Sequence, residues 1–338
     1  MSDEILTHDQ IVLHRERAWH GKGIIVPDAL TPREALTTIG ADYPIVQMPL
    51  VAISPFGSMV DVPNKVANVR ADIDLCLGVV SPNYKPIQNS ELADFAEALA
   101  EQGDVVKIES AGTIRNGGKI WFLLKGESFS VMSDDDVVMP YICVSNGHDG
   151  GTALRATPTT IRVVCSNTLH MVIPRYEGEN RRMKLDRPCF VGNHMGDVKA
   201  KVEAAKAALS LYGRSLDSTI GLIHEAASID MSSEDVKRFF LTNYVRDFGA
   251  IPTNPTNTVE KKRLERSQDA WLAFLCRFET EIAGTNAWGA FNAYTAWSQW
   301  GRGKGATPST LTDNQIGSHL FGLEADRAFA AFSTALAG

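Results

Sequence analysis

The chain has 338 residues, of which 44% are hydrophobic and 22% charged, and this composition is typical of a globular protein long enough to bury a core. No apolar run reaches the roughly 18–20 residues that cross a bilayer, and the acidic start "MSDEILTHDQ" is not a signal peptide, so we expect a cytoplasmic protein without a membrane partner. The formal net charge of −7 lies in residues 1–102, with 7 basic and 14 acidic residues, and argues against a general coat for duplex DNA.

Strand signals dominate the first half of the chain. Alternating apolar residues predict a strand at 69–80, and 105–126 reads as a long hairpin because Asn116, Gly117 and Gly118 tolerate the positive φ of a tight turn. Between them, 89–103 has helical periodicity, a cap at Asn89 or Ser90, and a stop at Gly103. Two further strands are predicted at 134–146 and 157–167.

Helix signals follow in the second half. Helices are predicted at 195–212, at 232–245 behind a Ser232–Asp235 capping signature, from Asn257 to Gly284, through the aromatic stretch that follows, and at about 312–336. We therefore predict an α+β fold, in which an antiparallel sheet with a long hairpin occupies residues 1–190 and a helical region, 191–338, packs on it as one structural unit.

The stretch "WGAFNAYTAWSQW" places an aromatic ring at every third position from 288 to 300. On an α-helix these rings drift by about 60° per step, so they spread around the helix while small residues form a stripe. This pattern leaves three alternatives, which are central burial, a subunit interface and base stacking. The residues of the candidate interface in a homo-oligomer are Trp288, Gly289, Phe291, Ala293, Tyr294, Ala296 and Trp297.

A basic segment from 155 to 187 holds seven bases and three acids, a local charge of +4. It is either a solvated loop or a surface that faces phosphates. The candidate nucleic-acid contacts in it are Arg155, Arg162, Arg181, Arg182 and Lys184. Lys119 beside the hairpin turn would extend the path, and Arg302 and Lys304 in "GRGKG" are weaker candidates.

No catalytic motif is recognisable, and we predict no enzyme, no cofactor and no metal. Five cysteines lie far apart without a CxxC pair, which indicates reduced thiols, and Cys165 falls on the apolar side of a strand although His170 is close in sequence. His148 and Asp149 in a glycine-rich loop, with Asp134–Asp136 upstream, leave open a site for a hard cation.

Several blocks carry a family resemblance. "VSNGHDGGTALRATP" (144–158), "TTIRVVCSNTL" (159–169), "GTNAWGAFNAYTAW" (284–297) and "SHLFGLEADRAFAAF" (318–332) resemble the phage/plasmid-like protein family that shares domain of unknown function 932, as do "RAWHGKG" (18–24) and "LGVVSPNYKPIQN" (77–89). Relatives tend to carry a His where this chain has "SQWGRG", so no role of that His is transferred. The resemblance implies a gene of phages, plasmids and integrated elements, without an established activity.

The predicted order of strands and helices also resembles the single-strand annealing proteins of phages, such as the Red-beta and Erf classes, by analogy of fold alone. That resemblance implies an oligomeric protein that binds single-stranded DNA beside a hairpin and acts in annealing and recombination. The alternative hypothesis is a non-enzymatic interaction protein, either an inhibitor of host defence or an assembly factor.

Overall fold

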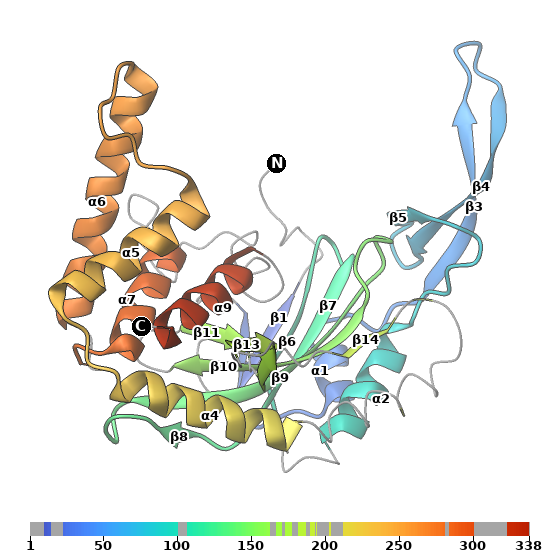
Figure 1. The fold of residues 1–338 in the computed structure, drawn as a ribbon. Helices are drawn as coiled ribbons and strands as arrows, with labels where there is room; N and C mark the ends of the chain where they lie inside the picture. The colour runs from blue at the N-terminus through green and yellow to red at the C-terminus, as the bar shows by residue number, and fades with distance from the viewer. Residues whose placement is uncertain are drawn as a thin grey trace.

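The computed structural model describes residues 10–14, 23–100, 107–162, 167–170, 173–177, 182–186, 190–192, 194, 203, 212–280, 284–300 and 323–337. Its architecture is α+β, as predicted (Figure 1). A large sheet lies at the centre, helices of the C-terminal half pack at one end of it, and a smaller sheet lies at the other.

The large sheet has the strand order β11-β10-β9-β7-β6-β1-β2, with β14 on β10 and β8 on β9. All of its pairings are antiparallel except that between β1 and β2. The strands are β1 (Ile11–His14), β2 (Ile24–Val26), β6 (Lys107–Ile114), β7 (Lys119–Lys125), β8 (Phe129–Ser130), β9 (Val137–Gly147), β10 (Leu154–Arg162), β11 (Asn167–His170) and β14 (Phe190–Gly192).

Helices α1 (Pro32–Thr38) and α2 (Asn89–Ala100) cover one face of this sheet. Thr31 and Glu34 form a reciprocal capping box that begins α1. The apolar side of α2, including Phe95, packs on alternate residues of the central strands such as Phe122 and Val144. The residues directly before and after these in each strand therefore face the opposite side of the sheet.

The hairpin predicted at 105–126 is confirmed as β6 and β7, and positive φ angles at Arg115, Asn116 and Gly117 build its turn. The single strand predicted at 69–80 is wrong. A turn at residues 71–74, with Asp74 at φ 52°, separates two antiparallel strands there.

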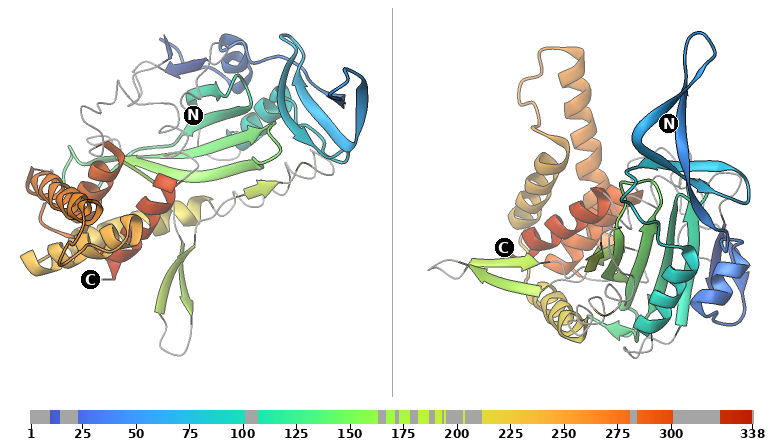
Figure 2. Two further views of the ribbon diagram at one scale, coloured as in Figure 1. Left: turned by 90° about the horizontal axis from the view of Figure 1, so that it is seen from above. Right: turned by 90° about the vertical axis from the view of Figure 1, so that its right-hand side faces the viewer.

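Those two strands belong to the smaller sheet, β3 (Ile45–Ile53), β4 (Met59–Arg70) and β5 (Leu75–Val80). Strand β5 pairs only with the residues of β4 from Val66 onward. Beyond that point β3 and β4 continue as a two-stranded ribbon that projects from the molecule, which we call the β3–β4 arm (Figures 1 and 2). The sequence analysis assigned no structure to residues 45–62.

A second two-stranded hairpin, β12 (Ile173–Glu177) with β13 (Arg182–Asp186), projects separately (Figure 2). The C-terminal half contains α4 (Tyr212–Ser228), α5 (Ser233–Phe248), α6 (Thr258–Thr280), α7 (Ala287–Trp300) and α9 (Leu323–Leu336). The predicted capping box of α5 is present, and Asn257 accepts the N–H of Glu260 at the start of α6. The predicted helix at 195–212 falls almost wholly outside the described residues.

Helix α7, which carries the aromatic stretch, lies in the centre of the helical half. Its rings contact rings of the neighbouring helices, since Phe291 packs on Phe332 of α9, and Trp297 on Phe240 of α5. The Trp288 indole N–H donates to the buried Asp136 at 3.3 Å. Gly289 is required because a Cβ there would clash with the carbonyl oxygen of Gly284.

This position corrects the predicted oligomer interface. All seven of its residues are buried within the chain itself, and they offer no surface to a second subunit: Trp288, Gly289, Phe291, Ala293, Tyr294, Ala296 and Trp297. Central burial, the first of the three alternatives, is what the structure shows. Among the helices of the described residues, none combines the length and the apolar character that crossing a membrane requires.

Replacing Trp288 by Ala tests this burial. The change removes a fully buried ring and leaves a cavity, so we expect the free energy of unfolding to fall by about 3–5 kcal/mol in urea titrations. Leu272→Ala, at an exposed position of α6, is the control and should change it by less than about 0.5 kcal/mol. A loss below about 1 kcal/mol for Trp288→Ala would contradict central packing.

Candidate functional site

The turn of the β6–β7 hairpin and the loop between β9 and β10 meet at one end of the large sheet. The backbone N–H of His148 donates to the carbonyl of Gly118 at 2.8 Å, which joins loop to turn. Strand β7 lies between β6 and β9, so the β6–β7 turn and the β9–β10 loop extend from neighbouring strands at the same end of the sheet. We call this end of the sheet, with residues 115–119 and 147–152, the rim.

Asp149 organises the rim. Its Oδ1 accepts the backbone N–H groups of Gly151 (2.9 Å) and Thr152 (2.8 Å), and its Oδ2 accepts the Thr152 hydroxyl (3.1 Å). The same Oδ2 lies 3.8 Å from both Arg115 Nη1 and Lys119 Nζ. Burial raises the pKa of Asp149, but the bonds from Gly151 and Thr152 and the charge of Lys119 outweigh burial, so the net pKa lies below its usual value.

The smaller sheet braces the rim from outside. Asn68 Nδ2 donates to the His148 carbonyl (2.9 Å), and Arg70 Nη1 donates to the Asn116 carbonyl (3.0 Å). The approach is so close that a Cβ on Gly78 would lie 2.7 Å from the backbone carbon of Asp149. Only glycine therefore lets β5 close on the loop.

His148 lies beneath the loop, fully buried. Because Asn89 Nδ2 donates to the Ala41 carbonyl, the Asn89 oxygen faces the His148 ring, and His148 Nε2 donates to it at 2.9 Å. Burial, followed by the neighbouring His194, lowers the pKa of His148 to about 3, while Asp149 opposes the shift. The His148 ring is therefore a neutral structural group at ordinary pH. The Asn89 side chain hydrogen-bonds this ring and does not cap α2.

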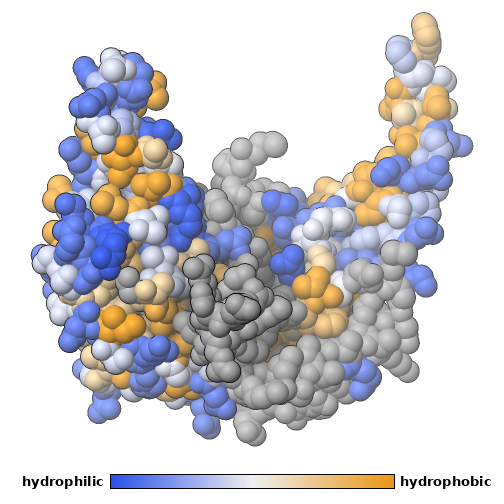
Figure 3. Space-filling view, viewed as in Figure 1, coloured by the Kyte–Doolittle hydropathy of each residue, from blue (hydrophilic) through white to orange (hydrophobic). Residues whose placement is uncertain are grey.

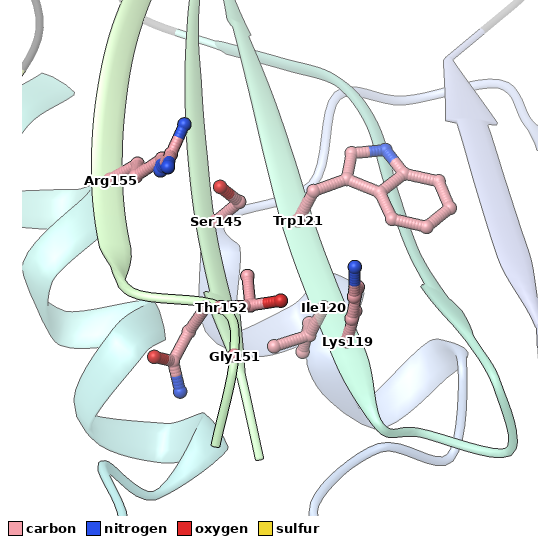
Figure 4. Close-up of a pocket in the computed structure, with 8 residues that line it drawn as sticks. Lys119, Ile120, Trp121, Ser145, Gly151, Thr152 and Arg155 are labelled. Atoms are coloured by element: carbon pink, nitrogen blue, oxygen red, sulfur yellow. The ribbon is translucent and has the colours of Figure 1, made fainter. Parts of the chain in front are cut away.

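A pocket of about 180 Å³ opens beside the rim on the face opposite α1 and α2 (Figure 4). Trp121, Ser145 and Arg155 form a row across β7, β9 and β10, because the register pairs each with the next. The indole of Trp121 lies over Gly112 of β6, where a Cβ would be 2.6 Å from the ring. The pocket is lined by Lys119, Ile120, Trp121, Ser145, Asn146, Gly151, Thr152 and Arg155.

Basic side chains gather around the pocket. Arg155 is exposed, and no described residue forms an ion pair with it. Arg115 and Lys119 share the single carboxylate of Asp149. Lys119 and Arg155 line the pocket together with hydroxyl and amide groups, an arrangement suited to an anion with several oxygen atoms.

The structure brings together two of the predicted nucleic-acid contacts, Arg155 and Lys119. It separates the others, so the +4 segment is not one patch. Arg162 is the last residue of β10, while Arg182 and Lys184 belong to β13, on the hairpin that projects separately (Figure 2). Arg181, Arg302 and Lys304 lie outside the described residues.

Four residues of the site are not among those predicted from the sequence: Arg115, Trp121, Ser145 and Thr152. One signal was present for Trp121, since alternation in a hairpin strand places it on the same face as Lys119, two positions earlier. Ser145 and Thr152 carried no signal, because only strand order brings them to Lys119.

Two of the residues considered for a cation, Asp149 and Asp136, have other partners. Asp149 holds its own loop, and the buried Asp136 accepts the Trp288 indole N–H. Among the described residues, no three His, Cys, Asp or Glu side chains are grouped as metal ligands would be. Cys143 is buried, whereas Cys76 and Cys276 are exposed, and all three are free thiols; Cys165 lies outside the described residues.

A family model described as Domain of unknown function (DUF932) matches residues 76–316, more than half of the chain. The chain belongs to this family. The DUF932 match includes every residue that lines the pocket, whereas β3 and most of the smaller sheet precede it. No curated protein and no solved structure matches the chain.

The buried His148 generates a prediction on pH. Its pKa of about 3 in the folded protein lies below the 6.5 of an unperturbed histidine, so the unfolded chain binds more protons between these values. The free energy of unfolding should therefore fall as the pH is lowered from 6.5 toward 3, by at most about 1.4 kcal/mol per pH unit from this group.

Urea unfolding between pH 7 and pH 5 tests this dependence. His148→Gln should flatten the slope relative to the parent protein, whereas His224→Gln, an exposed position on α4, should leave it unchanged. A His148 ring that titrates near pH 6.5 by NMR would contradict its burial as a neutral group.

Proposed function

We propose that this DUF932 protein binds single-stranded DNA, as a protein of the annealing and recombination type, and that the pocket beside the rim holds a backbone phosphate. A gene of phages or plasmids is part of this proposal. The observation that carries it is Arg155, an exposed guanidinium with no ion pair to any described residue, on the pocket that Lys119 also lines.

The electrostatics of the rim favour phosphate as the ligand. A planar guanidinium binds two phosphate oxygens at once, and an ammonium group adds a point charge. The Asp149 carboxylate is ionised and binds its own loop and Lys119, and it forms no ion pair with Arg155, so the Arg155 guanidinium faces the pocket without an ion pair to a described residue. The hydroxyls of Ser145 and Thr152 supply neutral donors for the remaining oxygens.

The size of the pocket favours a strand over a compact cofactor. Its volume of about 180 Å³ is below the roughly 300–1,000 Å³ of small-molecule sites, so it suits one phosphate of a longer ligand. Trp121 is only 3% exposed and offers no free face for base stacking. The contact is therefore to the backbone and independent of base sequence.

A single strand fits the charge of the chain better than a duplex. The net charge of −7, carried by residues 1–102, disfavours the dense phosphates of duplex DNA more than the sparser phosphates of a single strand. The β12–β13 hairpin offers a second contact, because Arg175 lies directly opposite Lys184.

A non-enzymatic interaction protein is the second candidate function. The observation that favours it is the β3–β4 arm, whose apolar side chains are exposed to solvent. An arm of this kind fits protein contacts rather than nucleic acid, and the two functions can coexist in one chain.

Anisotropy titrations of a labelled 30-nucleotide strand at several salt concentrations test DNA binding. Affinity should fall with salt with a log–log slope of about −0.7 per phosphate contact. Arg155→Ala should weaken binding alike on homopolymeric and mixed sequences and reduce the slope by about 0.7. Arg238→Ala, an exposed arginine on α5, is the control.

Two results would contradict the proposal. Absence of binding at low salt would exclude single-stranded DNA as the ligand. Binding that is indifferent to Arg155→Ala and to Lys119→Ala would exclude the pocket as its site and move the contact to Arg182 and Lys184.

A further inference from the structure

The β3–β4 arm ends in large apolar side chains that are exposed to solvent. Phe56 at the tip is 97% exposed, and Ile53 and Met59, which pair just behind it, are 74% and 77% exposed. In the space-filling view apolar surface runs along this arm (Figure 3). Apolar surface gathered on a projecting element marks a contact with another surface.

The apolar side chains lie on both faces of the arm. Residues paired across the two strands share a face, so Ile53 and Met59 lie on one face, and the exposed Val60, next to Met59 in β4, lies on the other. A protein partner, the second candidate function above, would have to enclose the arm in a groove to cover both faces. A lipid surface surrounds an inserted ribbon on all sides and needs no matching shape.

The tip of the arm satisfies its own backbone N–H groups. Ser54 donates its N–H to the Ser58 carbonyl at 2.8 Å, and Gly57 donates to the Ser54 carbonyl at 2.9 Å. The N–H groups of Phe56 and Ser58 both donate to the Ser54 hydroxyl, at 3.3 and 3.2 Å. Pro55 has no N–H, so every N–H from residue 54 to residue 58 is paired inside the turn. Internal pairing of this kind is what a medium without hydrogen-bonding groups requires.

The arm carries no charge near its tip. Along β4 the first charged side chain after Phe56 is Asp61, five residues away, and β3 contains none. Five extended residues span about 17 Å, which exceeds the roughly 5–10 Å by which interfacial elements enter a bilayer. The tip can therefore enter to that depth without removing a charge from water, and Asp61 opposes deeper insertion.

A second projection lies on the same side of the molecule. Figures 1 and 2 show the connection between α5 and α6 reaching in the same direction as the arm, so one flat surface can contact both. Helix α6 starts there with the exposed Val259, Lys261 and Lys262, and no described residue forms an ion pair with either lysine. The carboxylate of Glu260 accepts the N–H and the hydroxyl of Thr256. Lysines in this position suit the phosphates of lipid headgroups.

We propose that the protein binds the surface of a lipid bilayer, with the tip of the β3–β4 arm among the acyl chains and the start of α6 on the headgroups. The expectation of no membrane partner rested on the absence of a spanning segment, which surface binding does not need. The proposal does not depend on DNA binding, because Arg155 and Lys119 belong to the large sheet and not to the arm.

Vesicle flotation without DNA is the primary measurement, with phosphatidylcholine alone or with about 30% phosphatidylglycerol. The parent protein should float with both. The double change Ile53→Ser with Phe56→Ser should lower the partition coefficient at least about tenfold on both, because it removes two large apolar groups from the acyl region. Lys261→Gln with Lys262→Gln should weaken binding to the phosphatidylglycerol vesicles and change it little on phosphatidylcholine.

Matched variants separate insertion from loss of the fold and from DNA binding. The Ile53 and Phe56 double variant should keep the parent's melting temperature, because both side chains are exposed. Phe56→Leu retains an apolar tip and should float like the parent, as should Val191→Ser, an exposed apolar position on β14. Arg155→Ala should also float like the parent, whatever its effect on DNA.

Each part of the proposal has a result that would overturn it. A parent protein that floats with neither vesicle would exclude the membrane, and arm-dependent self-association in light scattering without flotation would assign the arm to a protein partner. A double variant at Ile53 and Phe56 that floats like the parent would exclude insertion of the tip. Indifference of phosphatidylglycerol binding to the lysine changes would exclude the contact of α6 with headgroups.

Discussion

The carboxylate of Asp149 is the interaction on which the rim depends. It closes its own loop through Gly151 and Thr152 and also holds Arg115 and Lys119. Because these hydrogen bonds favour the ionised form, the charge persists over the ordinary pH range. The loop is fixed from inside by this anion and from outside by the contact at Gly78. Arg155, which forms no ion pair with a described residue, lies on the pocket beside this loop together with Lys119. The pocket therefore joins one guanidinium to one ammonium group that Asp149 also contacts.

The elements that the sequence predicted are those whose local chemistry is decisive. The turn at Asn116 and Gly117 requires positive φ, and the caps Ser232 and Asn257 satisfy free N–H groups at helix starts, so these features are readable from short segments. The turn at 71–74 escaped prediction because apolar alternation continues on both sides of it. Apolar character all around α7 was predicted, but sequence alone does not tell whether neighbouring helices or a second subunit cover it.

The site was only partly predictable, because the net charge of a sequence segment does not show which of its basic residues lie close together in the fold. Arg155 lies on the pocket, whereas Arg182 and Lys184 of the same basic segment belong to the separately projecting β12–β13 hairpin. Lys119 lies far from Arg155 in sequence and on the same pocket, because β9 is the only strand between β7 and β10 in the sheet order. Strand order is a property of the whole fold, and it decided which of the basic residues share a site.

Strand β4 connects the rim to the β3–β4 arm. Near its end Asn68 and Arg70 bind the backbone of the loop and of the turn, while its first residues form the arm. These contacts are hydrogen bonds of buried or half-buried polar groups, which are directional and specify one arrangement more narrowly than apolar packing does. The arm is thus an extension of the element that braces the pocket.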